Sequence, residues 1–310
     1  MKKLQHIIMV ALILIGLVTP ALAQEQTDDF NVAAKHAIAI ESTTGKVLYE
    51  KDATTPDGVA SMTKILTAYM VYKAIDQGKI TWDTEVDISD YPFNLTVDSE
   101  VSNVPLDFRK YTVKQLLDAT LISSANSAAI ALAEKISGTE SAFVDTMKAQ
   151  LKKWGITDAK LYNASGLNNK YLGDNRYPGS KPDDENTMSA LDVAIIADHL
   201  IKDYPQVLDI TKQGAVDFEG DNKLTTHNYM LEGQDNYREG VDGLKTGTTE
   251  LAGASFVAHS NENGMSLITV VMNADNGGED EAARFTATND LLDYCLLYTS
   301  DAADDTPCVD

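Results

Sequence analysis

The sequence has 310 residues, of which 44% are apolar and 23% are charged. This composition predicts a folded protein with a large buried core and excludes a chain that is disordered along most of its length. The formal net charge of −22 disfavours binding to nucleic acid or to anionic lipid, because those surfaces are also negative. A simpler interpretation is that this charge keeps an exported protein soluble.

Residues 1–23 have the pattern of a secretory signal peptide. Lys2 and Lys3 give a positive start, residues 7–18 are apolar, and Ala21-Leu22-Ala23 offers small residues for cleavage. An uncleaved membrane anchor is the alternative, but the apolar run is short for a bilayer span. We therefore expect an exported protein that is cleaved after Ala23.

A hairpin and a buried helix are predicted next. His36 to Glu41 and Val47 to Glu50 read as strands around a Thr43-Thr44-Gly45 turn. Apolar residues cover much of the circumference of a helix predicted from Ser61 to Gln77, so we expect that helix to be central. Gly78 suits the position just after its C-terminus.

The middle of the chain is predicted to be mostly helical. Residues 80–111 are polar and mixed, with short strands at most, and Thr112 and Gln115 fit a capping box. From there we expect a helix to about Leu121 and a break at Ser123 to Asn126. Two more helices are predicted over Ser127 to Ile136 and Glu140 to Trp154. A long loop over Lys160 to Asp184 follows, and then a helix from the N-cap Ser189 to about Lys202.

Strands return near the end of the chain. They are predicted over Val241 to Gly247, Ala254 to His259 and Ser266 to Met272, with Asn263-Gly264 as a hairpin turn, followed by a helix over Glu279 to Tyr294. This order of elements predicts an α/β (α+β) fold. In it an antiparallel sheet is flanked by helices, and the middle of the chain forms a mostly helical subdomain.

Residues 295–310 resemble the in-frame translation of a sequencing adaptor, so we interpret them as an adaptor-derived tail. The only cysteines, Cys295 and Cys308, lie in this tail. They could form a disulfide in an exported protein, but the origin of the tail argues against it. We therefore expect one folded domain over residues 24–294.

Three motifs could carry chemistry, and the first is Ser61-Met62-Thr63-Lys64. Residues three apart on a helix share a face, so the amine can approach the hydroxyl. A serine needs a neighbouring base to become a good nucleophile, and a lysine can serve if burial and nearby cations lower its pKa. The alternative is an N-cap serine beside a solvated lysine, but apolar residues surround Lys64.

The second motif, Ser124-Ala125-Asn126, falls at the expected break between two helices, where side chains can point into a cleft. A serine hydroxyl can relay a proton, and an asparagine amide can bind a peptide bond as donor and acceptor. A polar helix junction is the alternative interpretation.

The third motif, Lys245-Thr246-Gly247-Thr248, lies on a predicted strand. Its lysine and hydroxyls can hold a carboxylate, and Gly247 lacks a side chain and so permits close approach of a substrate. A charged strand end is the alternative interpretation.

The motifs occur in the order S-x-x-K, S-x-N and K-T-G, the signature of penicillin-binding proteins and serine β-lactamases. From about Lys35 to Tyr294 the sequence resembles low-molecular-weight D-alanyl-D-alanine carboxypeptidases, most closely those of streptococci and their relatives. The resemblance rests on Val59-Ala60-Ser61-Met62-Thr63-Lys64, Ser124-Ala125-Asn126-Ser127-Ala128-Ala129, Ser165-Gly166-Leu167-Asn168-Asn169 and Asp242-Gly243-Leu244-Lys245-Thr246-Gly247.

The resemblance implies a β-lactamase/transpeptidase-like catalytic domain. Its activity would be that of a serine D,D-carboxypeptidase that removes the terminal D-alanine from peptidoglycan stem peptides ending in D-Ala-D-Ala. It implies Ser61 as nucleophile, Lys64 as general base and Ser124 as proton shuttle. The implied substrate-binding residues are Asn126, Lys245, Thr246, Gly247 and Thr248. The backbone N–H groups of Ser61 and Thr248 would form the oxyanion hole.

The resemblance also implies the partners of the protein. β-Lactam antibiotics would mimic the dipeptide and acylate Ser61. No cofactor, metal or nucleic acid is expected, and none of the five histidines has metal-ligand spacing. Members of the family carry a C-terminal β-rich domain and a membrane anchor. We therefore expect attachment to the outer face of the cytoplasmic membrane only in a full-length parent.

Three other functions remain open. A D,D-endopeptidase would use the same motifs on cross-linked peptides. A class A β-lactamase needs a glutamate in an E-x-x-x-N stretch well before K-T-G, whereas the only such spacing between Asn126 and Lys245 is Glu232 to Asn236, just ahead of Lys245. A non-catalytic β-lactam-binding domain would usually have lost a motif residue, and all of them are present.

Overall fold

The structure, a computed structural model, describes residues 30–97 and 100–304, with side chains for residues 30–97 and 100–297. The account below concerns the compact unit Asn31–Asp310. The predicted signal peptide and Cys308 lie outside the described residues, so the signal peptide and the absence of a disulfide to Cys308 stay predictions. Within the described ranges, no helix combines the length and the apolar character that a membrane span requires.

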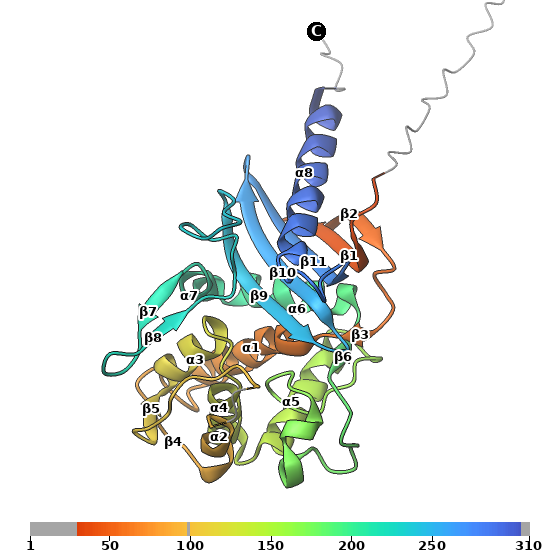
Figure 1. Ribbon diagram of the computed structural model, residues 1–310. Helices are drawn as coiled ribbons and strands as arrows, with labels where there is room; N and C mark the ends of the chain where they lie inside the picture. Colours follow the sequence, from red (N-terminus) through yellow and green to blue (C-terminus); the bar gives the residue numbers. More distant parts are fainter. Residues whose placement is uncertain (1–29, 98–99, 305–310) are drawn as a thin grey trace, which may run out of the picture. The chain divides into compact units, whose positions relative to one another are not determined.

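An antiparallel sheet of five strands has the order β2-β1-β11-β10-β9 (Figure 1). The predicted hairpin turn between β10 and β11 is confirmed, because Asn263 and Gly264 have φ angles of 51° and 79°. Asparagine and glycine tolerate this left-handed conformation best. The strands are β1 Ala34–Glu41, β2 Lys46–Lys51, β9 Val241–Thr249, β10 Gly253–Glu262 and β11 Met265–Ala274.

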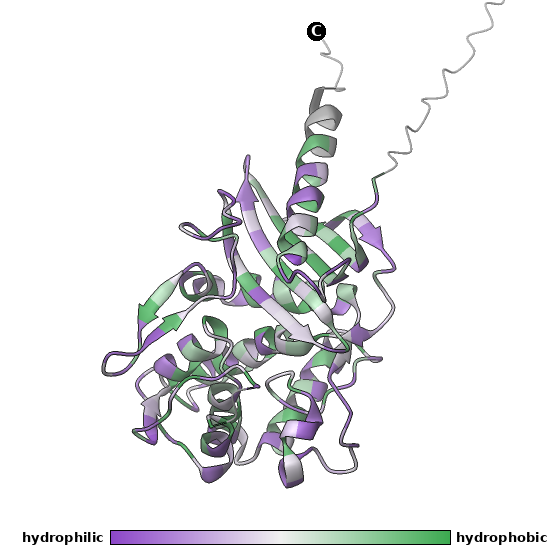
Figure 2. Cartoon of the chain, viewed as in Figure 1, coloured by the Kyte–Doolittle hydropathy of each residue, from purple (hydrophilic) through white to green (hydrophobic). Residues whose placement is uncertain are grey.

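Helices cover both faces of the sheet. Figure 1 shows α8 (Ala283–Asp304) in front of the sheet and α6 (Ala190–Asp203) behind it, and both helices contact β11. Figure 2 shows hydrophobic residues on the strands beneath α8. Because both faces are covered, the inner strands β10 and β11 are buried along most of their length. The predicted sheet flanked by helices is confirmed.

The last helix differs from its predicted bounds at both ends. It begins at Ala283 rather than Glu279, because residues 276–282 form hydrogen-bonded turns ahead of it. It continues to Asp304, since the sequence after Tyr294 contains no glycine or proline before Pro307. Cys295 is fully buried on this helix. The adaptor origin of residues 295–310 stays a prediction.

The middle of the chain forms the predicted, mostly helical subdomain. Its central helix is α1 (Thr63–Asp76), in which every residue from Thr63 to Tyr72 is buried. A 3₁₀ turn, η1 (Ala60–Met62), precedes α1, so the predicted helix starts as a tighter turn that carries Ser61. The other helices are α3 Val113–Leu121, α4 Asn126–Ser137 and α5 Glu140–Lys153.

Several short elements were not predicted. The helices α2 (Asp90–Leu95) and α7 (Leu208–Thr211) are too short to show a clear 3.6-residue period. The short paired strands are β3 Asp57–Gly58 with β6 Thr187–Met188, β4 Glu85–Asp87 with β5 Lys110–Thr112, and β7 Ala215–Asp217 with β8 Lys223–Thr225. Two of these pairs join distant segments of the chain and the third is a local hairpin, β7–β8.

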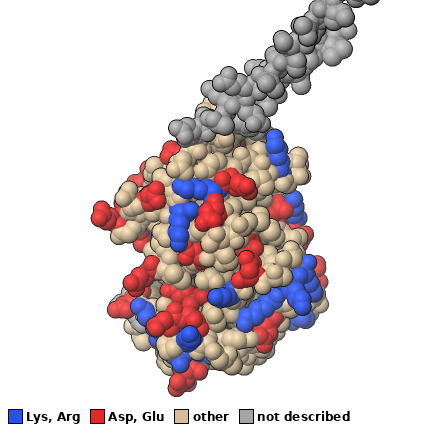
Figure 3. Space-filling model, turned by 90° about the vertical axis from the view of Figure 1, so that its right-hand side faces the viewer, with Lys and Arg blue, Asp and Glu red and all other residues tan. Residues whose placement is uncertain are grey.

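Charged side chains are interspersed on the surface. On the face seen in Figure 3, carboxylates alternate with lysine and arginine side chains. Mixed signs of this kind are typical of a solvated surface, which agrees with the simpler interpretation of the net charge.

Capping boxes begin α3 and α6. At α3, the Thr112 hydroxyl accepts from the Gln115 N–H and the Gln115 side chain accepts from the Thr112 N–H, as predicted. At α6, the hydroxyl of Ser189 accepts from the Asp192 N–H at 3.1 Å and the Asp192 carboxylate accepts from the Ser189 N–H at 2.9 Å. Each box satisfies two donors that the helix itself leaves unpaired.

The substitution Ser189→Ala should lower the free energy of unfolding by about 1 kcal/mol, because it removes the N-cap acceptor of α6. Urea unfolding followed by circular dichroism measures this change as a lower midpoint at an unchanged slope. An unchanged midpoint would show that the cap contributes nothing to stability.

Candidate active site

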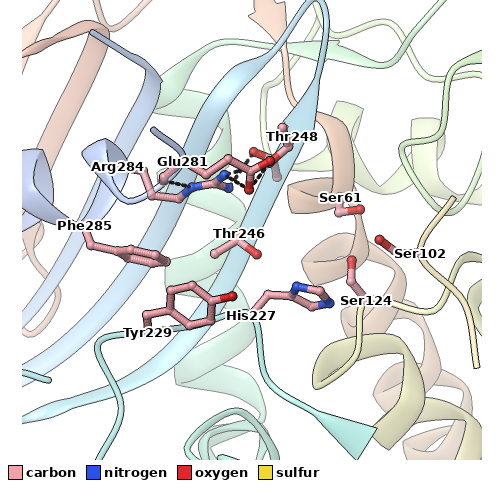
Figure 4. A pocket seen from close by; sticks show the side chains of 11 residues that line it. Ser61, Ser102, Ser124, His227, Tyr229, Thr246, Thr248, Glu281, Arg284 and Phe285 are labelled. Carbon is pink, nitrogen blue, oxygen red and sulfur yellow. Dashed lines mark hydrogen bonds and ion pairs between the residues drawn. The ribbon is translucent and has the colours of Figure 1, made fainter. Parts of the chain in front are cut away.

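The three predicted motifs meet beside the edge strand β9. Ser61, Ser124 and Thr246 to Thr248 line one pocket, and Figure 4 shows Ser61 on η1, Ser124 before α4, and Thr246 and Thr248 on β9 around it. A second pocket, lined in part by Asn126, Tyr171 and Glu185, shares Ser61, Ser102 and Thr248 with the first. Ser61 therefore borders both pockets.

Lys64 is fully buried and its amine points toward Ser61. The distance between Lys64 Nζ and Ser61 Oγ is 2.8 Å. The same nitrogen lies 2.7 Å from Asn126 Oδ1 and 2.7 Å from the Ser165 carbonyl oxygen. All three partners are uncharged, so hydrogen bonds rather than an ion pair hold the amine in place.

Burial lowers the pKa of Lys64 well below its usual value, and the positive charge of Lys245 lowers it further. A neutral amine has a lone pair that can take a proton. Because Ser61 is the hydroxyl beside this amine, the geometry suits activation of Ser61 as a nucleophile.

Ser124 and Asn126 approach the cleft from the start of α4. Ser124 has a φ angle of 58°, which is uncommon for a residue with a side chain, and it lies among the pocket residues in Figure 4. Asn126 accepts from Lys64 through Oδ1 and donates through Nδ2 to the Ser102 carbonyl at 2.9 Å. In this structure the amide of Asn126 thus orients the lysine.

Lys245 is almost completely buried on β9, where its amine lies 3.1 Å from the Thr246 carbonyl oxygen. Burial lowers the pKa of Lys245 to about 7, and the charge of Arg284 contributes to this shift. Among the described residues, no carboxylate forms an ion pair with Lys245.

Gly247 has a structural role that the sequence did not reveal. A Cβ atom at this position would lie 2.8 Å from the Val59 carbonyl oxygen, so only glycine lets η1 pack this closely on β9. The other role expected of Gly247, close approach of a substrate, stays a prediction.

Arg284 belongs to this pocket, and the sequence analysis missed it. Its guanidinium is buried and donates to the carbonyl oxygens of Gly247 and Ser255 at 3.1 and 3.2 Å. It also donates to Thr248 Oγ1 at 2.8 Å and to the Glu281 carboxylate at 2.6 Å (Figure 4). The signal for Arg284 that the sequence offered was a single basic residue among mostly apolar residues on one face of the predicted last helix.

Residues 163–167 form a rigid loop behind Lys64. Oδ1 of Asn163 accepts from the backbone N–H of Gly166 at 2.6 Å and of Ser165 and Leu167 at 3.2 Å. Gly166 has a φ angle of 81°, and a Cβ atom there would lie 1.8 Å from the Ala60 carbonyl oxygen. The loop therefore packs directly on the turn that carries the serine.

Ser123 connects the second motif to the β7–β8 hairpin. Its hydroxyl accepts from the Thr225 N–H at 2.9 Å and lies 3.1 Å from the Thr225 carbonyl oxygen. His227 and Tyr229, which follow β8 in the chain, line the pocket in Figure 4. Ser123 thereby fixes the segment that bounds this side of the cleft.

Taken together, the fold and a serine hydroxyl in contact with a buried lysine amine are typical of serine-type hydrolases. The family model described as D-alanyl-D-alanine carboxypeptidase matches residues 22–276. The chain belongs to this family, and it is a serine peptidase. Among the described residues there is no group of three or more histidine, cysteine or carboxylate side chains that could hold a metal ion.

Relatives and solved structures agree with this assignment. The chain is 31% identical to the D-alanyl-D-alanine carboxypeptidase DacF of Bacillus subtilis, over 91% of this chain and 69% of that protein. It is 29% identical to DacA of Escherichia coli, over 91% and 68%.

Two solved structures share the fold. PBP3 of Streptococcus pneumoniae, a peptidoglycan synthesis regulatory factor, is 61% identical with a TM-score of 0.84, and the match covers 86% of this chain and 74% of that one. Penicillin-binding protein D2 of Listeria monocytogenes in its ampicillin-bound form is 27% identical with a TM-score of 0.71, and the match covers 86% and 99%. The predicted transpeptidase-like fold is confirmed.

The substitution Ser123→Ala should loosen the β7–β8 hairpin, because the Thr225 N–H loses its acceptor at a cost of about 1–3 kcal/mol. Hydrogen exchange should show faster exchange of the Thr225 amide, while amides in β10 and β11 keep their protection. Unchanged exchange at Thr225 would contradict the role given to Ser123.

Proposed function

We propose that this enzyme removes the terminal D-alanine from peptidoglycan stem peptides ending in D-Ala-D-Ala, with Ser61 as the nucleophile. The observation that carries the proposal is the buried Lys64 amine, 2.8 Å from Ser61 Oγ, whose pKa is lowered by burial and by Lys245. In its neutral form, which the lowered pKa favours, this amine is a base in contact with the hydroxyl that must lose its proton.

Acylation begins when Lys64 takes the proton of Ser61 and Oγ attacks the carbonyl carbon of the penultimate D-alanine. The backbone N–H groups of Ser61 and Thr248 would stabilise the oxyanion. The tetrahedral intermediate then breaks the peptide bond, and Ser124 passes a proton from Lys64 to the leaving amino group. The products are free D-alanine and an ester on Ser61. Asn126 would bind the substrate backbone once the ligand is present.

The carboxylate of the substrate would lie between Lys245, Thr246 and Thr248. Burial of Lys245 strengthens its attraction for an anion, because little water competes. Arg284 holds the hydroxyl of Thr248 from behind and adds positive charge to this end of the pocket. This cluster of cations and hydroxyls therefore favours a substrate that ends in a free C-terminal carboxylate.

Deacylation repeats the same chemistry with water as the nucleophile. Lys64, neutral again after its proton has gone to the leaving amine, takes a proton from water, and the hydroxide attacks the ester carbonyl. The bond between the acyl group and Ser61 Oγ breaks, and Oγ regains a proton. A β-lactam would enter the first step as a mimic of the dipeptide and leave a penicilloyl ester on Ser61.

The place of action that we propose is outside the cytoplasm. The signal-peptide pattern of residues 1–23 supports export, and the peptidoglycan substrate lies outside the cytoplasm.

Ser61→Ala and Lys64→Ala should each lower the release of D-alanine by at least about 1000-fold, because each removes a member of the reacting pair. The assay follows free D-alanine from a D-Ala-D-Ala peptide at saturating concentration. Intact mass after exposure to benzylpenicillin provides the second readout, with a one-drug adduct on Ser61 in the wild type and none on Ser61→Ala. Retained release by either variant contradicts these roles, and rapid drug turnover without a lasting adduct would indicate a β-lactamase.

Binding of the substrate carboxylate should weaken as the pH rises above about 7. Lys245, whose pKa is lowered to about 7, is cationic below that pH and neutral above it. If only the cation binds, affinity is flat below pH 7 and falls by up to about tenfold per pH unit above it. Calorimetry with a D-Ala-D-Ala peptide measures this affinity at each pH, and the Ser61→Ala variant is used so that the peptide is not hydrolysed. Lys245→Gln is the control and should bind weakly without this pH dependence. An affinity that stays constant up to pH 9 in the Ser61→Ala variant would exclude Lys245 as the titrating group.

A further inference from the structure

Glu140 is a buried carboxylate that belongs to none of the three motifs. It is the first residue of α5, and only 5% of it is exposed. Its Oε1 accepts from the Ala164 N–H at 2.9 Å, and its Oε2 accepts from the Tyr91 hydroxyl at 2.7 Å. No basic group is within ion-pair distance of it among the described residues. The two hydrogen bonds therefore have to offset the cost of its burial.

Both backbone polar groups of Ala164, the residue that Glu140 contacts, form hydrogen bonds with side chains. Its N–H donates to Glu140 of α5, and its carbonyl oxygen accepts from the Thr67 hydroxyl of α1 at 2.6 Å. Thr67 follows Lys64 by three residues, so both point from the same face of α1. The peptide unit at Ala164 thus spans the space between two helices of the subdomain.

The next residue along the chain contacts the lysine. The Ser165 carbonyl oxygen lies 2.7 Å from Lys64 Nζ, and it is one of only three polar atoms that hold this amine in the described part of the chain. Because Ser165 is covalently joined to Ala164, a shift of Ala164 moves that oxygen as well. An amine that loses one of three contacts no longer keeps a single orientation toward Ser61 Oγ.

We propose that Glu140 is a positioning residue for the reaction, which fixes Ala164 and thereby sets the Ser165 carbonyl that aims the Lys64 amine at Ser61. The proposal rests on the proposed function, since it assigns Glu140 a role through Lys64 as the base. Glu140 itself touches neither the nucleophile nor the cleft.

The positioning role of Glu140 does not depend on its charge. Burial raises the pKa of Glu140 to about 7, so both protonation states are populated at neutral pH, and either one presents an oxygen to the Ala164 N–H. A glutamine also offers such an oxygen, and its amide group can donate to the Tyr91 oxygen. An alanine offers neither. The pair Glu140→Gln and Glu140→Ala therefore separates the hydrogen bond from the charge.

The experiment compares kcat and KM for D-alanine release, and the rate of acylation by benzylpenicillin, in the wild type and in Glu140→Ala and Glu140→Gln. Glu140→Ala should lower kcat and the acylation rate by about 10- to 100-fold with KM within about threefold, because misplacement of a catalytic group slows the chemical step. Glu140→Gln should stay within about threefold of the wild type in both constants. Thermal unfolding confirms that each variant is folded.

Two further variants complete the test. Glu134, on α4, is a carboxylate of the same subdomain that accepts from Ser89, and in the described part of the chain no side-chain hydrogen bond joins it to residues 163–167. Glu134→Ala should leave kcat unchanged, so it controls for the loss of a carboxylate. Thr67→Val removes the other hydrogen bond to Ala164 and should lower kcat in the same way as Glu140→Ala. Should Glu140→Ala not fold, Thr67→Val together with Glu140→Gln decides the question.

The results distinguish this inference from the proposed function. A folded Glu140→Ala with normal kcat, a Glu140→Gln as slow as the alanine variant, or a Thr67→Val with normal kcat would overturn the positioning role alone. A wild type that releases no D-alanine, or a Lys64→Ala variant with full activity, would instead overturn the proposed function.

Discussion

The rest of the site depends on burial of the Lys64 amine without a carboxylate partner. In water this amine would be a cation, and a cation cannot take the proton of Ser61. Burial in the central helix α1 removes most of its hydration, and three uncharged oxygens replace the lost water. The three oxygens come from η1, from α4 and from the loop over residues 163–167, so the amine is oriented only when these segments are assembled around α1.

A second constraint is the gathering of basic side chains in a protein with a net charge of −22. The charge of Lys245 lowers the pKa of Lys64, and the charge of Arg284 lowers the pKa of Lys245. The carboxylate of Glu281 offsets positive charge only at Arg284. In the proposed mechanism, the same arrangement favours both a neutral Lys64 amine and the binding of a substrate carboxylate.

The sequence was informative where a pattern is local. Capping residues predicted the starts of α3 and α6, and Asn263-Gly264 predicted a hairpin, because those residues determine the backbone around themselves. The three motifs were found for the same reason, and the structure places them in one cleft. Arg284, Glu140 and Ser123 were missed because each acts through a residue far away in the sequence. The partners of these three residues depend on how whole helices and strands pack together. The spacing of residues along the sequence does not predict that packing.

The two glycines of the motif segments show why such long-range contacts matter for the nucleophile. Sequence analysis assigned Gly247 to substrate access, yet its missing side chain leaves room for the Val59 carbonyl, and that of Gly166 leaves room for the Ala60 carbonyl. These two carbonyl groups belong to the residues just before Ser61. The turn that carries the serine is thus held between β9 on one side and the loop behind Lys64 on the other. Backbone contacts with both segments restrict the movement of Ser61 relative to Lys64, which favours the 2.8 Å distance between hydroxyl and amine from which the proposed proton transfer would start.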